Sequence, residues 1–342
     1  MKEISQKDNS LLPTNKKPKI LWILITQAIT MFLVVMGHSN LGVNDNVYFN
    51  SIYGYFRPFR MPMFVFISGY LFYLTRIEKE KQYSFVVKDK LIRLGIPFLF
   101  FTILGFLFKI IASNFIKHPI NNISIKEVFY SIIGINLNPY DALWFIQIIF
   151  LFMLLYPIYC YVFKNIWLTS ILGIIILYVY FHPIHINYFL LQRSSTRWIF
   201  FYVGMLFCKY RLDKNIPPNY LYLLIWIIIY STLYLINVSF TEIPEILLSF
   251  IGITMILHFS KIAEKHFHRI FSSYRHNTYQ IYLISVFPQM GLEIIFRQLG
   301  EHYYLFFFIL NIIIGLYIPI LVVKIVEYIN WRPLKVAIGL SK

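Results

Sequence analysis

The chain has few charged residues and few cysteines for its length of 342 residues. Charged side chains make up 13% of the sequence and hydrophobic residues 58%, whereas about a quarter of the residues in soluble domains are charged. This deficit excludes an ordinary soluble globular protein. Cys160 and Cys208 lie in apolar stretches without pairing or metal-ligand spacing, so we predict neither a disulfide framework nor a metal site.

Acidic residues are scarcer than basic ones: 15 of them stand against 31 lysines and arginines, which gives a formal net charge of +16. Such an excess is typical of nucleic-acid-binding proteins. Here, however, the cations lie at the ends of hydrophobic segments, so no nucleic-acid partner is predicted. The first 19 residues are polar and no small-residue cleavage site follows them, so no cleavable signal peptide is expected.

Long hydrophobic segments are abundant. About ten of them approach the ~20 residues that a helix needs to cross the hydrocarbon core, and 20% of the residues are aromatic, which suits lipid-facing and interfacial positions. We therefore predict an all-α, polytopic membrane protein in contact with membrane lipids. The predicted spans are 20–38, 57–75, 94–112, 142–163, 166–182, 195–209, 219–236, 245–260, 278–296 and 303–323.

The lysines and arginines predict the orientation, because loops rich in them stay in the cytoplasm. With the N-terminus in the cytoplasm, ten spans return the C-terminus to the same side and leave most of the cations there. The predicted parts are a cytoplasmic basic N-terminal tail (1–19), an integral membrane domain (20–324) and a cytoplasmic C-terminal tail (325–342).

The first predicted span ends in His38, a titratable side chain at membrane depth and hence a candidate functional residue. Arg57 and Arg60 open the second span on the same side, and Arg193 and Arg197 open another there. Taken singly, His38 also fits a helix cap, and each arginine fits snorkelling to the interface. Their convergence favours a cavity for an anionic or sugar-like ligand.

Five segments occur in a characteristic order over nearly the whole chain: TQAITMFLVVMGHS, FRMPMFVFISGYLF, KDKLIRLGIPFLF, DALWFIQIIFLFMLLYP and YRHNTYQIYLISVFP. Together they resemble the motifs of the membrane acyltransferase-3 family, particularly its fucose 4-O-acetylase-like branch. The resemblance implies O-acetylation of a cell-surface polysaccharide or its lipid-linked precursor. Cytoplasmic acetyl-CoA would be the acyl donor, and the expected location is a bacterial inner membrane.

The resemblance and the chemistry of acyl transfer predict roles for individual residues. His38 matches the histidine that is held to be catalytic in the family. It would deprotonate the acceptor hydroxyl or transiently carry the acyl group, and Arg60 would stabilise the thioester oxyanion or bind an acidic sugar or lipid diphosphate. The predicted acceptor-binding residues are Asp141, Trp144, Arg57 and Arg197, and the predicted donor-binding residues are Arg93 and Gln27.

Several of these residues have a second interpretation. Asp141 also fits a helix N-cap, and Trp144 fits an interfacial aromatic belt. The six cations of the predicted cytoplasmic loop 76–93, among them Arg93, also fit attraction to anionic lipid headgroups.

Three positions depart from the family's pattern. Gln27 stands where a basic residue usually lies eleven positions before His38, about 16 Å along the same helical face. Arg60 replaces a histidine that is frequent in the branch, and Ser285 replaces the histidine that commonly ends the late motif. Gln27 and Ser285 favour an alternative function, that of a non-enzymatic or degenerate member that takes part in surface polysaccharide export or assembly.

Overall fold

The computed structural model describes residues 21–41, 47–111, 113, 124–135, 138, 140–183, 189–240, 244–300 and 302–340. Every regular element within these ranges is helical, which confirms the all-α fold. The predicted N-terminal tail lies outside the described residues. The α-helices are α1 (Leu21–Gly37), α2 (Val47–Phe72), α3 (Tyr83–Lys90), α4 (Ile96–Ile111), α5 (Ile125–Ile132), α6 (Trp144–Leu154), α7 (Tyr156–Val162), α8 (Ile166–Phe181), α9 (Phe189–Lys209), α10 (Tyr220–Phe240), α11 (Glu245–His266), α12 (Thr278–Ile284), α13 (Val286–Gln298), α14 (Tyr304–Ile329) and α15 (Arg332–Ala337).

Several helices suit a membrane. Within the described residues, four segments are long and apolar enough to cross one by length and composition: the continuous run Tyr83–Ile111, α10, α11 and α14. The pair Asp141–Leu154 and Tyr156–Val162, bent by 50°, is a fifth candidate, and α1 and α8 are apolar but shorter. These helices support a membrane protein.

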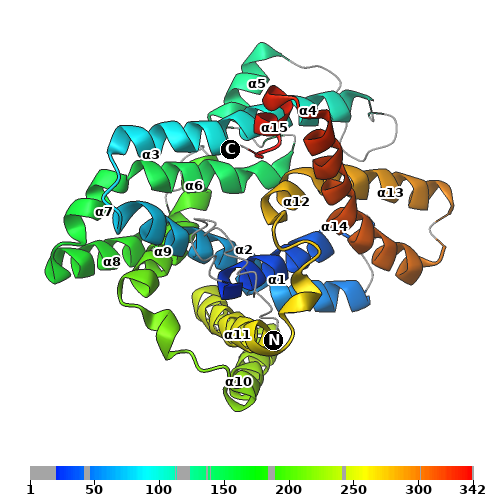
Figure 1. Cartoon of the computed structure of the whole chain (residues 1–342). Coiled ribbons are helices and arrows are strands. Elements are labelled where there is room, and N and C mark those ends of the chain that lie inside the picture. The colour runs from blue at the N-terminus through cyan, green and yellow to red at the C-terminus, as the bar shows by residue number, and fades with distance from the viewer. Residues whose placement is uncertain are drawn as a thin grey trace, which may run out of the picture.

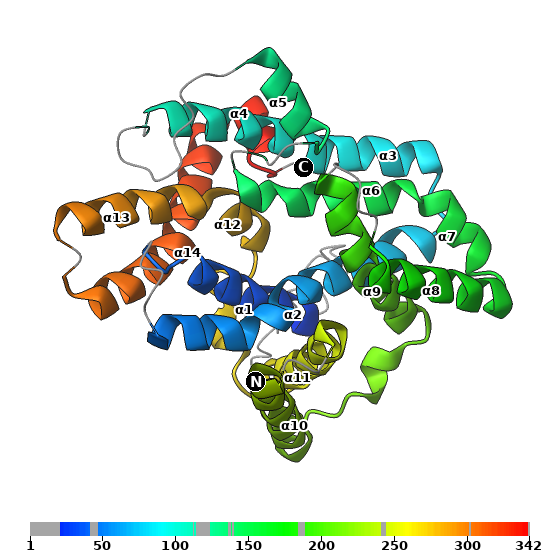
Figure 2. The same cartoon turned by 180° about the vertical axis from the view of Figure 1, so that it is seen from behind.

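The centre of the bundle is formed by α1 and α2, with α9, α11, α12 and α14 around them (Figure 1). The view from behind in Figure 2 has the same arrangement. α2 crosses α9 closely because both helices lack a side chain at the crossing. A Cβ on Gly69 would lie 2.0 Å from the Phe201 carbonyl oxygen, and one on Gly204 would lie 2.0 Å from the Phe66 carbonyl oxygen.

Two predicted spans are broken at prolines. The span 142–163 bends at Leu155, where Pro157 enters the first turn of α7, and the span 278–296 is interrupted at Ser285, with Pro288 in the first turn of α13. Proline lacks the N–H that a continuous helix needs and clashes with the preceding turn. Each span is therefore two helices.

The predicted loop 76–93 is wrong as a loop. Its second half forms α3, which continues through the π-helical turn Leu91–Gly95 into α4. The carboxylate of Asp89 explains why a basic segment folds this way. It accepts a hydrogen bond from Arg76 at 2.5 Å and forms an ion pair with Arg93 at 3.1 Å.

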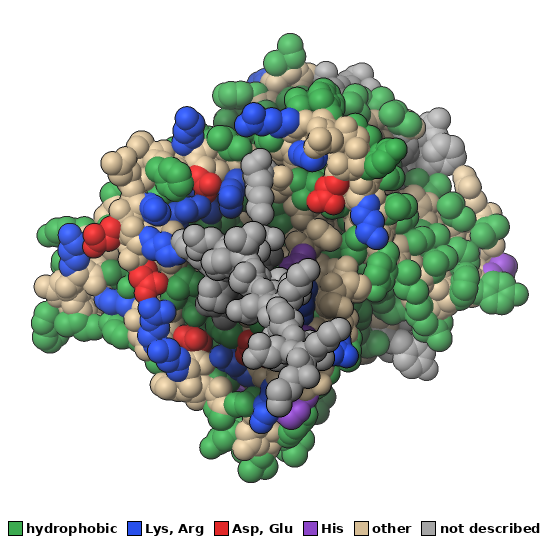
Figure 3. Space-filling model, in the orientation of Figure 1, with side chains coloured by type: hydrophobic (Ala, Val, Ile, Leu, Met, Phe, Trp, Pro, Cys, Tyr) green, Lys and Arg blue, Asp and Glu red, His purple; other side chains and the backbone are tan. Residues whose placement is uncertain are grey.

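Lysine and arginine side chains gather on one face of the molecule, over and around α3, whereas hydrophobic side chains cover much of the side formed by α13 and α14 (Figure 3). Exposed cations of α3 and of the turn before it include Lys79, Lys81 and Lys88. The bundle thus has a charged end and an apolar periphery, as a membrane-embedded helical protein requires.

Candidate active site

One face of α1 forms a continuous lining. Gln27, Met31, Val34 and His38 are spaced by four, three and four residues, so they lie in one stripe along the helix. The other faces of α1 are packed in the core, where Trp22, Ile25, Ala28 and Val35 are fully or almost fully buried. The stripe connects two cavities.

The first cavity lies at the His38 end and has a volume of about 290 Å³; we call it the histidine cavity. It gathers residues from α1, α2, α9, α12 and the 3₁₀ turn Asp141–Leu143 before α6. Its lining consists of Val34, His38, Tyr53, Arg60, Met61, Asp141, Ala142, Trp144, Arg193, Thr196, Arg197 and Tyr282.

Arg60 lies directly beside His38 because position 37 is a glycine. A Cβ on Gly37 would fall 1.5 Å from Nη1 of Arg60, so the guanidinium occupies the space that a side chain would take. Nη2 of Arg60 donates to the Tyr53 hydroxyl at 3.2 Å, and the guanidinium carbon lies 4.7 Å from the centre of the Tyr53 ring. The positive charge is therefore held within the wall, next to the imidazole.

A second cation of the lining, Arg193, is held by an acidic and an aromatic side chain. Nη1 of Arg193 donates to Oδ1 of Asp141 at 3.3 Å, and its guanidinium lies 4.8 Å from the Trp144 ring centre. The partner of Asp141 is thus Arg193. The Tyr282 hydroxyl donates to the Ala142 carbonyl and so holds the 3₁₀ turn that carries Asp141 against α12.

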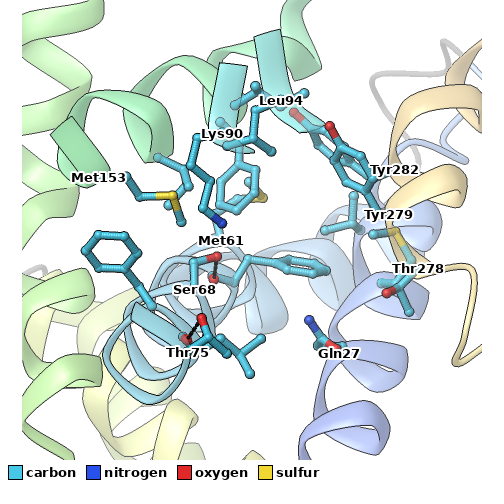
Figure 4. Close-up of a pocket in the computed structure, with 18 residues that line it drawn as sticks. Gln27, Met61, Ser68, Thr75, Lys90, Leu94, Met153, Thr278, Tyr279 and Tyr282 are labelled. Carbon is cyan, nitrogen blue, oxygen red and sulfur yellow. Dashed lines mark hydrogen bonds between the residues drawn. The ribbon is translucent and has the colours of Figure 1, made fainter. Parts of the chain in front are cut away.

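The second cavity, of about 200 Å³, lies at the Gln27 end of the stripe (Figure 4). We call it the lysine cavity, because the Lys90 side chain reaches into it toward Ser68 and Met61. Within the described chain, the Lys90 ammonium has no hydrogen-bond or ion-pair partner. The lining is mostly apolar, with polar groups from Gln27, Ser68, Thr75, Lys90, Thr278, Tyr279 and Tyr282.

The two cavities share part of their lining. Val34, Met61 and Tyr282 contribute to both, so these side chains form the partition between them. α2 lines both cavities as α1 does, with Tyr53, Arg60 and Phe64 on one face, which continues to Thr75 in the π-helical turn Tyr73–Ile77. The two cavities therefore adjoin each other at Val34, Met61 and Tyr282.

Most of the residues singled out from the sequence line these cavities. His38, Arg60, Asp141, Trp144 and Arg197 line the histidine cavity. Gln27 lines the lysine cavity.

Two of the predicted residues lie elsewhere. Arg57 is exposed and lines neither cavity. Arg93 is half exposed and paired with Asp89, whereas Lys90, three residues earlier, enters the lysine cavity. The basic motif KDKLIR marks Lys90 as a candidate donor-binding residue. The direction of its side chain, however, depends on a π-helical turn, which a 3.6-residue period does not reveal.

The end of α1 is held by a buried polar cluster. Nε2 of Gln289 on α13 donates to the Val35 carbonyl and to the Ser39 hydroxyl, both at 2.9 Å. Ser39 in turn donates to the Val35 carbonyl at 2.9 Å. These bonds fix the backbone on both sides of His38, since a lost buried hydrogen bond leaves a polar group unsatisfied.

With this geometry in view, the comparison with known families is decisive. The model of the acyltransferase-3 family, described as an acyltransferase domain, matches residues 20–323. The chain belongs to this family. It is accordingly a membrane acyltransferase, and all of the cavity residues named above lie within the matched range. Searches among curated proteins and among solved structures find no significant match.

Proposed function

We propose that the chain is an O-acetyltransferase of the bacterial inner membrane. It would move an acetyl group from cytoplasmic acetyl-CoA to a hydroxyl of a cell-surface polysaccharide or its lipid-linked precursor. In this proposal both termini are cytoplasmic and about ten segments cross or enter the bilayer. The carrying observation is the pair of cavities that meet at Val34, Met61 and Tyr282, with His38 on one side and Lys90 on the other.

The lysine cavity is the proposed donor side. Its volume of about 200 Å³ lies below the ~300–1,000 Å³ of typical whole-ligand pockets, so it suits the narrow acyl-bearing arm of acetyl-CoA. The phosphates would stay at the basic face, where Arg93 lies. The Lys90 ammonium, which has no hydrogen-bond or ion-pair partner among the described residues, would attract them from within the cavity.

The histidine cavity is the proposed acceptor side. His38 accepts the proton of the acceptor hydroxyl, whose oxygen then bonds to the thioester carbonyl carbon. The carbon–sulfur bond breaks, and the departing thiolate takes the proton from His38. Negative charge develops on the carbonyl oxygen during this step, and the neighbouring Arg60 guanidinium is placed to stabilise it.

Replacing His38 tests the proposal. In a strain that lacks the native gene, His38→Ala should lower the O-acetyl content of the surface glycan by about 100-fold or more, because the base is lost. The matched control is His302→Ala, which removes an exposed histidine of the connection between α13 and α14. Both variants are compared with the wild type at equal membrane levels.

The alternative is a family member that takes part in polysaccharide export or assembly without transferring acyl groups. Gln27, which brings no charge to the lysine cavity, and Ser285, buried at the break between α12 and α13, favour it. Equal O-acetyl content in the wild type and His38→Ala, with altered polymer secretion, would replace the enzyme by this alternative.

A further inference from the structure

The histidine cavity has an excess of positive charge. Its lining contains the guanidinium groups of Arg60, Arg193 and Arg197 and a single carboxylate, that of Asp141. Outside the lining, the Glu245 carboxylate at the start of α11 attracts the Arg197 guanidinium, whereas Arg57 repels it. With His38 neutral, the described lining therefore contains three cations and one anion.

Arg193 is already engaged by the protein. It is paired with Asp141 and lies over the Trp144 ring. A guanidinium placed in this way organises the wall and covers one face of the indole. Asp141 is therefore paired with Arg193, and the lining contains no further carboxylate for Arg60 and Arg197 among the described residues.

Arg60 and Arg197 have unused hydrogen-bond donors. Among the described residues, Arg60 makes one hydrogen bond, from Nη2 to Tyr53, and its buried Nε has no partner. Arg197 is half buried and makes no hydrogen bond or ion pair within the described ranges. A guanidinium has five N–H donors. The nearby charge of Glu245 gives those of Arg197 no hydrogen-bond acceptor among the described residues, and buried donors without an acceptor are costly.

We propose that Arg60 and Arg197 bind an oxyanion of the acceptor, a carboxylate or a phosphate, and so place a neighbouring hydroxyl at His38. This inference rests on the proposed function, because it names the acceptor class of the same site. Guanidinium groups match both anions through paired N–H donors. A volume of about 290 Å³ suits one sugar ring or one phosphate-bearing group of the acceptor.

Binding to the purified protein tests the inference without any transfer reaction. The thermal unfolding midpoint is measured in an uncharged detergent without a sugar headgroup, since a ligand that binds the folded state raises it. Glucuronic acid is compared with glucose, and farnesyl diphosphate with farnesol. The anionic member of at least one pair should raise the midpoint more than its neutral counterpart, and the pair that responds distinguishes a sugar carboxylate from a lipid-carrier phosphate.

Variants locate the binding. Arg197→Gln should weaken the affinity for the anionic probe by about tenfold or more, the size of a lost charge-assisted hydrogen bond, and Arg197→Lys should weaken it less. Lys126→Gln, which removes an exposed cation of α5, is the matched control and should bind as the wild type does. Added sodium chloride should lower the wild-type affinity through screening, and this measurement stands even if Arg197→Gln fails to fold.

The outcomes separate the two proposals. Equal effects of charged and neutral probes, or equal weakening by Arg197→Gln and Lys126→Gln, would overturn the oxyanion site. His38→Ala should keep the anion affinity, because the arginines remain. If that variant binds the anion and still acetylates the glycan, the proposed reaction fails while the anion site stands.

Discussion

At the scale of single residues, the site depends on the absence of a side chain. Gly37 leaves the space that the Arg60 guanidinium fills next to His38. Sequence patterns place a glycine before the histidine but do not say why, because the reason lies 23 positions further along the chain, on α2. The distance between the imidazole and the positive charge is thus set by position 37.

Gly37→Ala is predicted to damage the reaction. The added methyl group would meet Arg60 Nη1 at 1.5 Å, so the guanidinium must move away from His38. We expect an activity loss of about a hundredfold to a thousandfold, the range for removing one group that stabilises an oxyanion. The measurement is glycan O-acetyl content at matched protein level.

Gly291→Ala on α13 is the control for Gly37→Ala. A Cβ there meets nothing within 4 Å, so activity should be unchanged, and the replacement of a helical glycine should raise stability by about 0.5–1 kcal/mol. Full activity of Gly37→Ala would show that the placement of Arg60 is unimportant.

At the scale of the elements, two π-helical turns border the lysine cavity, Tyr73–Ile77 after α2 and Leu91–Gly95 after α3. Such turns insert an extra residue into the helical ladder and are frequent at functional sites. Here the second turn separates Lys90, which faces the cavity, from Arg93, which lies at the surface.

Substitutions in this segment should therefore have graded effects on the donor. Lys90→Gln is expected to raise the KM for acetyl-CoA by about tenfold, equivalent to about 1.4 kcal/mol. Arg93→Gln should have a smaller effect, because this side chain is half exposed and shares Asp89 with Arg76. Lys88→Gln, at an exposed position of α3, is the control. A larger effect at Arg93 than at Lys90 would contradict the assignment of Lys90 to the donor.

The sequence predicts the elements better than their interruptions. His38, Arg60, Asp141 and Arg197 lie near the ends of hydrophobic segments on one predicted side, so their meeting in one cavity could be expected. The direction of Lys90 could not, because periodicity assumes an uninterrupted α-helix. The breaks at Leu155 and Ser285 had a visible signal in Pro157 and Pro288, but a membrane helix tolerates proline when its neighbours satisfy the backbone.

At the scale of the whole molecule, the two cavities follow one another along α1 and α2, and the lysine cavity is the one nearer the charged face. The lysine cavity receives Lys90 from α3, over which the cations of Figure 3 gather. The histidine cavity is lined from the other ends of α1 and α2. The proposed orientation puts the first end in the cytoplasm and the second on the outer side of the bilayer.

Single cysteines test this orientation. In a chain whose Cys160 and Cys208 are replaced by alanine, Lys126→Cys on α5 should react with a membrane-impermeant thiol reagent in intact cells. Lys214→Cys, in the turn after α9, should react only after permeabilisation. Both positions are exposed, so access is decided by the side of the membrane. The reverse labelling pattern would invert the proposed topology.

The shared wall of Val34, Met61 and Tyr282 has a consequence for permeability. In the proposed orientation the two cavities approach this wall from opposite sides of the bilayer, so these three side chains would form the local barrier between them. In the proposed reaction the acyl group would pass between the cavities at this wall. Replacing these three side chains by alanine should therefore raise the leakage of protons across the membrane, and growth should suffer even where acylation persists.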